Sequence, residues 1–365
     1  MSGTKTADLG SSAVRLDREV FTAKVEDFLE SYCLEQISEA KKVGPGYVEL
    51  WHQINNYIKG GGKRIRPYML ALSYVAHGGK ELDSIVPIAA SVELFHTFLL
   101  VHDDIIDRDT TRHGKLNITG AYLKKYESLP PEDARHYADS AALLAGDLLL
   151  NATHGIVNSS YADLDTKSKI VSYYRKAMFF TGGGEFIDVE SAMISISQSD
   201  PDSIMLNKTA IYSFMLPLAS GAALANASQT QIDQIEEVGL ELGLIFQETD
   251  DLLGVFGDQE QTGKSNRTDI REKKRTSLIK AVYQSSDSEI KNRLDQLYNF
   301  DHTLTDNEVD EVFEIIQKSR AEDVIQQDIE RKAAKATEQI SKLKVNEYGQ
   351  QALLSILKKV SKRDH

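Results

Sequence analysis

The sequence contains a single cysteine, Cys33, among its 365 residues. One thiol excludes an internal disulfide framework and fits a reducing compartment, where Cys33 would be an inert, small apolar side chain. Basic residues are also in deficit, because 42 Lys and Arg stand against 55 Asp and Glu, a formal net charge of −13. This balance argues against general binding to nucleic acid or to an anionic membrane. An anionic substrate would therefore need local basic groups or metal ions to overcome the field of the whole chain.

Long hydrophobic runs are missing as well. The nearest is the uncharged stretch 209–227, which Ser213, Pro217 and Gly221 interrupt, so it predicts a buried core helix instead of a membrane span. Residues 1–12 are small and polar and lack the apolar centre of a signal peptide, which predicts a disordered tail and a cytoplasmic protein. We expect no nucleic-acid partner and no stable membrane insertion.

Proline is scarce, with seven residues, and alternating β-branched runs between turn pairs are few. Helical periodicity dominates instead, and it predicts helices over residues 16–40, 85–107, 138–157, 167–180, 208–227 and 230–253. The glycines at 60–62 predict a break, those at 182–184 a break or a close-packing point, and residues 257–275 a loop or lid. Because no repeat or compositional shift marks a second unit, the sequence predicts one all-α domain over residues 13–360.

Two aspartate-rich segments lie on predicted helices in opposite halves of the chain. Asp103, Asp104 and Asp107 fall within an arc of about 100° on one helical face. Like charges this close destabilise a helix unless a cation neutralises them, and such oxygen ligands suit Mg²⁺ shared with a phosphate-bearing substrate. The second segment is Gln247-Glu248-Thr249-Asp250-Asp251. Two such clusters facing one cavity could hold a diphosphate between metal ions. The alternative is a solvated acidic face, although residues 103–107 end an otherwise apolar run.

Basic residues gather at two glycine-bearing segments. Lys63, Arg64 and Arg66 follow the glycines at 60–62, where a close backbone approach and forked arginine contacts would suit an anion. The alternative is a flexible basic connection; the spacing of a Walker loop is absent. Further cations lie in the predicted lid, where they could close over a diphosphate or remain solvated surface. Isolated residues have ordinary explanations too: His96 and His102 as core histidines, Lys208-Thr209 as a helix start.

Taken in this order, these segments resemble the trans-isoprenyl diphosphate synthases, and in particular the geranylgeranyl diphosphate synthases. The residues that carry the resemblance are Gly61-Gly62-Lys63-Arg64-Ile65-Arg66-Pro67, His96, His102-Asp103-Asp104-Ile105-Ile106-Asp107, Arg112, Lys208-Thr209, Phe246-Gln247, Asp250-Asp251 and Gly263-Lys264. They span more than half of the chain. No single motif is decisive, but six in register are highly specific.

The resemblance implies a bundle of helices around a deep central cavity, usually as a homodimer, and it implies roles for the matching residues. Isopentenyl diphosphate would be held by Lys63, Arg66, His96 and His113. Three Mg²⁺ ions would be bound by five carboxylates, namely Asp103, Asp104, Asp107, Asp250 and Asp251. These carboxylates and Lys208 would form the catalytic set. The allylic diphosphate or its leaving group would contact Arg112, Lys208, Thr209, Gln247, Lys264 and Lys274. An allylic primer of C5 to C15 would be extended by isopentenyl diphosphate.

Four positions depart from the common pattern of the family. His113 replaces a second arginine after Arg112, which makes one contact to isopentenyl diphosphate weaker or pH-dependent. Glu185 replaces a glutamine, Lys273 a glycine, and Gly254 the third aspartate of the second cluster. These changes bear on rate and substrate preference more than on the class of reaction.

Product length is expected to depend on Phe98, with its neighbour Leu99. Phe98 lies five residues before Asp103, about 7.5 Å along a helix, where a ring could floor the cavity. The resemblance links an aromatic residue there to C15–C20 products, and we favour C20. The alternatives are core packing for Phe98 and a farnesyl or longer-chain product for the enzyme.

Two other functions compete with this prediction. A terpene synthase would ionise the same substrates, but a cyclase has no second diphosphate for Lys63, Arg66 and His96 to hold. A non-catalytic regulatory subunit would be expected to lack the metal carboxylates, and both clusters are present.

Overall fold

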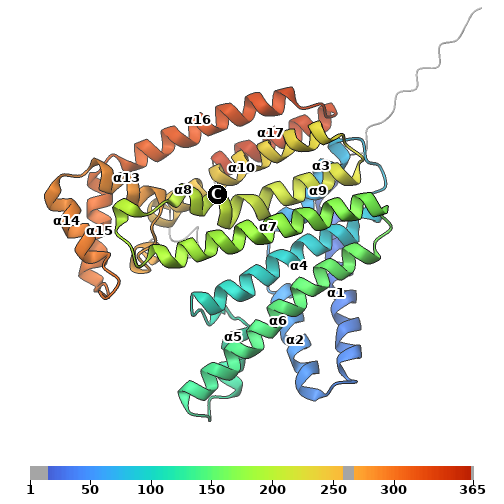
Figure 1. Cartoon of the computed structure of the whole chain (residues 1–365), viewed down its shortest axis with the longest axis horizontal. Helices are drawn as coiled ribbons and strands as arrows, with labels where there is room; N and C mark the ends of the chain where they lie inside the picture. The colour runs from blue at the N-terminus through green and yellow to red at the C-terminus, as the bar shows by residue number, and fades with distance from the viewer. Residues whose placement is uncertain (1–14, 258–266, 363–365) are drawn as a thin grey trace, which may run out of the picture.

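The computed structural model describes residues 15–257 and 267–362, and within them the chain is almost entirely helical (Figure 1). The first half contains α1 (Arg18–Ala40), α2 (Pro45–Lys59), α3 (Ile65–Ala76), α4 (Leu82–Ile106), β1 (Thr111–Arg112), β2 (Lys115–Leu116), α5 (Ile118–Lys125), α6 (Pro131–Ser159) and α7 (Leu164–Ser191). The second half contains η1 (Ile196–Gln198), α8 (Pro201–Ile204), η2 (Met205–Met215), α9 (Leu216–Leu224), α10 (Gln229–Phe256), α12 (Thr268–Arg271), α13 (Ser277–Ser285), α14 (Ser288–Leu297), α15 (Asp306–Lys318), α16 (Ala321–Lys342) and α17 (Glu347–Ser361). The all-α prediction is confirmed, and the tail predicted for residues 1–12 lies outside the described residues.

Helix α4 carries the first aspartate cluster at its C-terminal end and lies in the middle of the fold. It packs against α6, α1 and α3, which explains why its buried residues cover most of its faces. By length and composition alone, α4 and α6 could each cross a membrane, but 72% of the apolar window of α4 is buried inside the fold, as in a core helix. The acidic C-terminal end of α4 is therefore positioned by the buried, apolar part of the same helix.

Element η2 is an 11-residue π-helix and lies between α7 and α10. A Cβ at Gly184 of α7 would lie 2.4 Å from the backbone nitrogen of Lys208, and one at Gly243 of α10 would lie 2.5 Å from Cα of Ala210. Glycine at these two positions therefore permits the close approach of both helices to η2. Interior π-helices recur at functional sites, because the extra residue per turn redirects side chains.

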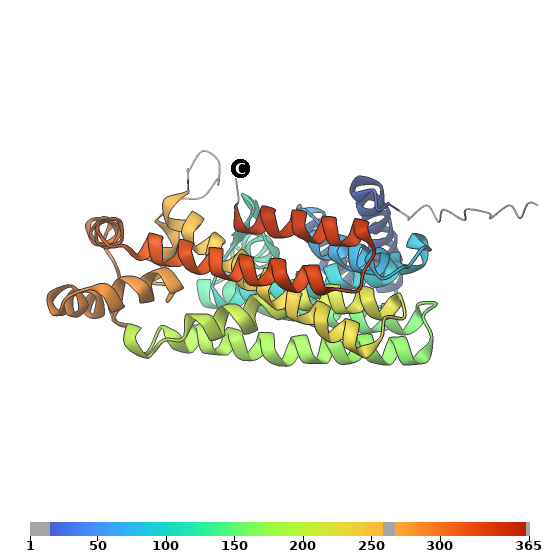
Figure 2. The same cartoon turned by 90° about the horizontal axis from the view of Figure 1, so that it is seen from above.

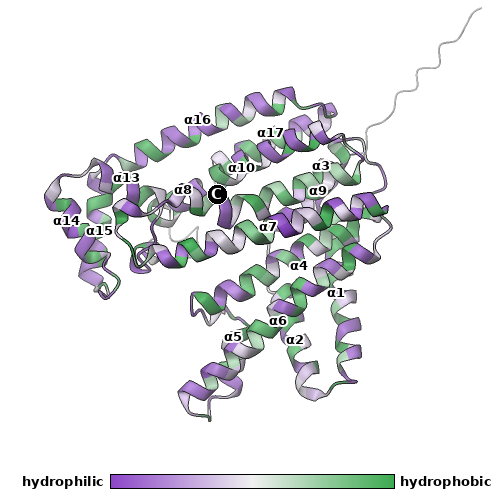
Figure 3. Cartoon of the chain, viewed as in Figure 1, coloured by the Kyte–Doolittle hydropathy of each residue, from purple (hydrophilic) through white to green (hydrophobic). Residues whose placement is uncertain are grey.

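The helices form layers when the molecule is viewed from above (Figure 2). Helix α7 lies on one outer side, α10 lies behind it, and α16 and α17 cover α10. A capping box between Ser228 and Gln231 starts α10, as its sequence predicts. Helix α16 mixes hydrophilic and hydrophobic residues along its length (Figure 3), as expected for an outer helix with one packed face.

Two of the alternatives left open by the sequence do not hold at the level of helices. Helix α7 runs through residues 182–184 without a break, so only the close-packing alternative holds, and it holds at Gly184. Lys208 does not start a helix; it lies inside η2, which continues directly from α8. The break at the glycines at 60–62 is confirmed, since α2 ends at Lys59 and α3 begins at Ile65.

Candidate active site

The first aspartate cluster is bound to a cation of its own chain. Arg112, on strand β1, donates from Nε (2.8 Å) and Nη2 (2.6 Å) to Oδ1 of Asp104, and from Nη2 to Asp103 at 3.2 Å. The hydroxyl of Tyr57 donates to the other oxygen of Asp104 at 2.8 Å. Burial raises the pKa of Asp104, and Arg112 opposes that shift. The short hairpin β1–β2 thus carries Arg112 back over the end of α4.

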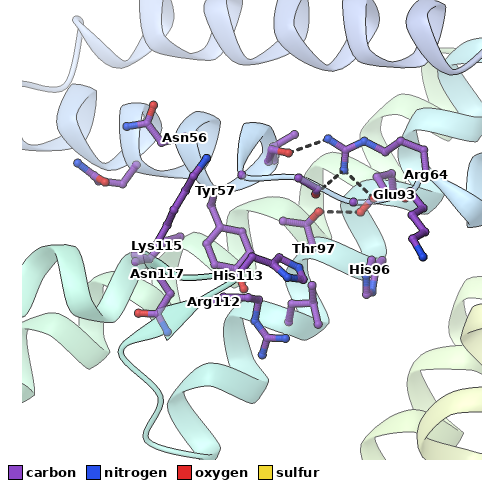
Figure 4. Close-up of a pocket in the computed structure, with 18 of the residues that line it drawn as sticks. Asn56, Tyr57, Arg64, Glu93, His96, Thr97, Arg112, His113, Lys115 and Asn117 are labelled. Atoms are coloured by element: carbon purple, nitrogen blue, oxygen red, sulfur yellow. Dashed lines mark hydrogen bonds and ion pairs between the residues drawn. The ribbon is translucent and has the colours of Figure 1, made fainter. Parts of the chain in front are cut away.

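A cavity of about 230 Å³ lies next to this cluster (Figure 4). Its walls come from the end of α2, the glycine segment, α3, α4 and the hairpin, and they include Lys63, Arg66, His96, Arg112 and His113. The structure therefore brings together all four residues predicted to hold isopentenyl diphosphate, from three segments of sequence. Basic side chains gather at this cavity although the net charge of the chain is −13. An anionic substrate requires such a local excess of positive charge.

Arg66 and His96 are fixed by η2. Arg66 donates to Oγ of Ser213 at 2.8 Å and to the hydroxyl of Tyr212 at 3.2 Å, and its guanidinium lies over the Tyr212 ring. The same ring stacks on His96 with centroids 5.8 Å apart. Desolvation is the main cause that lowers the pKa of His96 well below 6.5, and the nearby charge of Arg66 is the second. The imidazole is therefore neutral at pH 7. His96 would therefore contact a diphosphate through a neutral ring.

Arg64 belongs to the same basic motif, but its side chain stabilises the fold through contacts within the protein. It adopts a left-handed backbone conformation, with φ of 45°, and its side chain turns into the protein. There it donates to Glu93 at 2.8 Å and to the carbonyl of Ile58 at 2.7 Å (Figure 4). The buried Arg64–Glu93 pair connects the basic segment to α4 at the wall of the cavity, and the charge of Arg64 is neutralised there by Glu93.

Lys208 is surrounded by carboxylates. Its Nζ lies 2.7 Å from Asp188, 2.9 Å from Glu185 and 3.6 Å from Asp103. Burial lowers the pKa of Lys208, but the three carboxylates outweigh that effect and raise it above its usual value. Burial raises the pKa of Glu185 to about 6 against the opposing effect of Lys208. Lys208 thus links the first aspartate cluster to α7.

The second cluster lies near the end of α10. Gln247 donates to Asp251 at 2.9 Å, as their four-residue spacing predicts. Burial raises the pKa of Asp251 to about 7, while Gln247 opposes the shift. Behind the cluster, Glu248 is 1% exposed and forms an ion pair with Lys332 of α16. This pair ties the acidic end of α10 to the outer helix.

Lys274 forms ion pairs with Asp269 and Glu272, both at 3.1 Å. Burial raises the pKa of Asp107 in the first cluster and of Asp251 in the second, and the charge of Lys274 opposes both shifts without outweighing them. Burial and the charge of Asp103 nevertheless leave the pKa of Asp107 raised to about 6, although part of its side chain reaches solvent. Lys264, predicted to contact the same diphosphate, lies outside the described residues.

Two departures from the family pattern have a geometric explanation. A Cβ at Gly254 would lie 2.3 Å from Oδ2 of Asp269, so the carboxylate of Asp269 occupies the space that a third aspartate of the cluster would need. Lys273 has a left-handed backbone with φ of 54°, which glycine adopts without strain. Its ammonium donates to the carbonyls of Asn299 (2.8 Å) and His302 (2.5 Å), contacts that glycine could not make.

Phe98 lies inside α4 and is 1% exposed. Its ring makes edge contacts with Phe95 and with His102, the residue before Asp103. Leu99 is partly buried on the next face of the helix. These contacts fit core packing as well as a cavity floor. Thr209, beside Lys208 on η2, is partly buried.

The donor set fits Mg²⁺. Carboxylates whose pKa is raised by burial and by one another gain most from a nearby cation. Among residues 15–257 and 267–362, no three His, Cys, Asp or Glu side chains are close enough to hold an ion unaided. Mg²⁺ commonly binds through one or two carboxylates and completes its shell with water and substrate phosphates.

Sequence reasoning missed several residues that shape this site, namely Tyr57, Asp188, Tyr212, Ser213 and Asp269. Asp188 had a signal, because it lies three residues after Glu185 and shares its helical face. Tyr212 and Ser213 lie four and five residues after Lys208, so they too belong to the same helix. Tyr57 and Asp269 reach the site through tertiary contacts that no local pattern reveals.

An all-α fold with a basic cavity beside paired aspartate clusters defines a class of enzymes that handle diphosphate esters. Residues 48–316 match the family model described as polyprenyl synthetase. The chain belongs to this family and is a prenyltransferase of the isoprenyl diphosphate synthase class.

Named relatives agree on the class and differ in product. A geranylgeranyl diphosphate synthase of Saccharolobus solfataricus is 31% identical over 71% of this chain and 73% of its own length. A geranylfarnesyl diphosphate synthase of Aeropyrum pernix is 33% identical over 61% and 66% respectively. The structure is similar to that of geranylgeranyl pyrophosphate synthase from Corynebacterium glutamicum complexed with isoprenyl diphosphate and magnesium. That comparison has a TM-score of 0.86 and 27% identity, and it covers 95% of this chain and all of the other.

Proposed function

We propose that this enzyme condenses isopentenyl diphosphate head-to-tail with an allylic diphosphate of C5 to C15 to give a short-chain trans-prenyl diphosphate, most favourably the C20 geranylgeranyl product. The observation that carries the proposal is the position of Arg112. It lines the basic cavity and is bonded to both Asp103 and Asp104. Two anion sites that share one arginine suit two diphosphate substrates that must react with each other.

Isopentenyl diphosphate is assigned to the basic cavity. Lys63 and Arg66 supply positive charge, and Arg66 keeps its orientation through Ser213 and Tyr212. His113, exposed on the hairpin with φ of 52°, adds a further polar contact. Arg112 would then face the diphosphates of both substrates.

The allylic diphosphate is assigned to the space between the aspartate clusters. Three Mg²⁺ ions would be held by the first cluster (Asp103, Asp104 and Asp107) and by the second (Asp250 and Asp251). When bound, they would neutralise the negative charge that grows on the departing diphosphate. Lys208, Arg112 and Lys274 add fixed positive charge on the same group, with Thr209, Gln247 and Lys264 as further contacts.

The chemistry follows from this arrangement. The allylic C–O bond breaks, and the bonding electrons leave with the diphosphate. The double bond of isopentenyl diphosphate then forms the new C–C bond with the allylic carbon. A proton is lost from the adjacent carbon to the released diphosphate, which restores a double bond. Water must be excluded during this step, because it would otherwise capture the cation.

Phe98 and Leu99 are proposed to limit the length of the product. On α4, at a rise of 1.5 Å per residue, Phe98 lies about 7.5 Å and Leu99 about 6 Å before the first cluster. A chain that grows away from the aspartates along α4 would meet the Phe98 ring, which neighbouring rings brace. Farnesyl and longer-chain products are the alternatives, in keeping with the different products named for the relatives.

A homodimer formed through α6 and α7 is part of the proposal. The outer faces of these helices expose large apolar side chains, including Leu143, Leu144, Phe179 and Phe186. Phe179 is 75% exposed and Phe186 66% exposed, and such a patch on a folded chain marks an interface. A second copy covers it symmetrically. We further propose a cytoplasmic enzyme whose synthase domain spans residues 13–360.

Incubation with Mg²⁺, labelled isopentenyl diphosphate and each of the C5, C10 and C15 primers, followed by chain-length analysis, tests the proposal. A linear C20 diphosphate is the expected product. Cyclic hydrocarbons would point to a terpene synthase, and no turnover with any primer would favour a non-catalytic subunit. Either result overturns the proposal.

A further inference from the structure

Glu185 stands beside the lysine assigned to the allylic diphosphate. Gly184 allows α7 to approach η2 so closely that the next residue, Glu185, reaches the ammonium of Lys208 at 2.9 Å. Asp188, one helical turn further on, reaches the same ammonium at 2.7 Å. The contact therefore follows from the backbone packing of two helices.

The ammonium of Lys208 donates a hydrogen bond to Asp188 and lies within ion-pair distance of two further carboxylates. A protonated lysine has three N–H donors and no acceptor, and three carboxylates surround this one: Asp103, Glu185 and Asp188. The four groups carry a formal charge of −2 when all are ionised. A diphosphate that binds Lys208 must compete with at least one of these carboxylates.

Glu185 is the one of these three carboxylates that has a buried oxygen without a hydrogen-bond partner. Asp103 also contacts Arg112 and is assigned to the metal. Oε1 of Glu185 is buried without a hydrogen-bond partner, while Oε2 faces Lys208. A glutamine, the residue common in the resembling family, would have the same size and could still accept a hydrogen bond from Lys208, but it would carry no charge.

We propose that Glu185 is a positioning residue that restrains Lys208 and lowers the affinity of the site for the allylic diphosphate and for the released diphosphate. The proposal rests on the role assigned to Lys208 above. The negative charge of Glu185 competes with the diphosphate for the ammonium of Lys208 and also repels the diphosphate. Because Glu185 is partly buried, solvent and salt screen both effects only weakly. Weaker retention of the released diphosphate would favour turnover.

Three variants separate charge from structure. Glu185→Gln removes the charge and keeps the size, Glu185→Asp keeps the charge, and Glu190→Gln makes the same chemical change at an exposed position of α7. With Mg²⁺ present, calorimetry should show inorganic diphosphate binding about fivefold more tightly to Glu185→Gln, as expected for one nearby charge. The other two variants should stay near wild type.

Kinetics supply the second readout. The KM for the allylic diphosphate should fall in Glu185→Gln, while the KM for isopentenyl diphosphate, which binds in the other cavity, should not change. Unchanged diphosphate affinity in Glu185→Gln, or an equal shift in Glu190→Gln, would overturn the proposal. If the wild type binds diphosphate but elongates no primer, the proposed function fails, and the calorimetric comparison still decides the role of Glu185.

Discussion

Nε and Nη2 of Arg112 both donate to the same oxygen of Asp104, at 2.8 and 2.6 Å. The two residues lie on different elements, since Arg112 comes from the hairpin and Asp104 from α4. Because Arg112 also lines the basic cavity, this contact joins the site assigned to isopentenyl diphosphate with the site assigned to the allylic substrate. Loading with both substrates would redistribute the contacts of this arginine.

Replacing Asp103 should remove turnover while leaving the fold intact. Asp103 contacts both Arg112 and Lys208, and loss of electrostatic stabilisation of this kind lowers kcat by a factor of about 10²–10³. The measurement is kcat for Asp103→Ala, together with a thermal melt. Asp133→Ala, an exposed aspartate in the first turn of α6, is the matched control and should keep wild-type activity. Near wild-type turnover in Asp103→Ala would refute its metal role.

Shortening Phe98 should lengthen the product. Phe98→Ala removes the ring proposed to floor the cavity, so chain growth should continue beyond C20. Loss of a buried phenylalanine also destabilises a protein by about 3–5 kcal/mol, so the assay should be run well below the unfolding temperature, with Phe98→Leu in parallel. The measurement is the chain-length distribution, and an unchanged distribution in Phe98→Ala would leave core packing as the only role of this residue.

Breaking the Arg64–Glu93 pair should cost far more stability than breaking a surface pair. Both side chains are about 5% exposed, and removing one partner of a buried pair destabilises by about 3–5 kcal/mol. The comparison is Glu93→Ala against Asp83→Ala, whose partner Lys24 is exposed and whose loss should cost less than about 1 kcal/mol. Equal free energies of unfolding from denaturant titration would contradict the structural role of Arg64.

Restoring the missing third aspartate should harm the enzyme. In Gly254→Asp the new side chain would meet the carboxylate of Asp269, which already lies 2.3 Å from the Cβ position. We expect a lower melting temperature and lower turnover. Gly155→Asp is the control, because a Cβ at Gly155 has open space around it. A gain in activity for Gly254→Asp would show that Asp269 does not occupy this position.

Acidification should destabilise the protein partly through His96. Its pKa in the folded chain lies below the unfolded value of about 6.5, so the unfolded chain binds the proton first as pH falls. The free energy of unfolding should therefore decrease below about pH 6.5, by at most about 1.4 kcal/mol per pH unit from this group. His96→Gln should flatten this dependence in denaturant titrations at pH 5 and 6.5, whereas His52→Gln, at an exposed site, should not. If the free energy of unfolding of His96→Gln and that of the wild type showed the same dependence on pH, the lowered pKa of His96 would be contradicted.

The sequence predicted the helices and the charged clusters within single helices because both follow from local spacing, whereas the grouping of distant charged segments was implied by the resemblance. The period of the apolar residues defines α4 and α10, and the same period places Gln247 next to Asp251. It did not predict that α7 continues through three glycines, since the helix there is stabilised by packing against η2 and not by propensity.

Contacts between distant segments were beyond the reach of spacing. The stacking of Tyr212 on His96 joins residues more than a hundred positions apart. The Glu185–Lys208 contact spans a smaller separation but likewise joins two different elements, α7 and η2. The sequence also did not predict that Arg64 and Arg66 of the basic motif have different roles. Arg64 and Arg66 are two residues apart and both line the cavity, yet Arg64 is bonded to Glu93 and to the carbonyl of Ile58, whereas Arg66 is bonded to Tyr212 and Ser213 of η2.

A crystal structure with Mn²⁺ in place of Mg²⁺ and inorganic diphosphate tests the central claim most directly, since Mn²⁺ can be located by anomalous scattering. The account predicts metal peaks on carboxylates of the first cluster and of the second, with one diphosphate bound to both sets. Metal confined to one cluster, or a diphosphate held away from both, would contradict it.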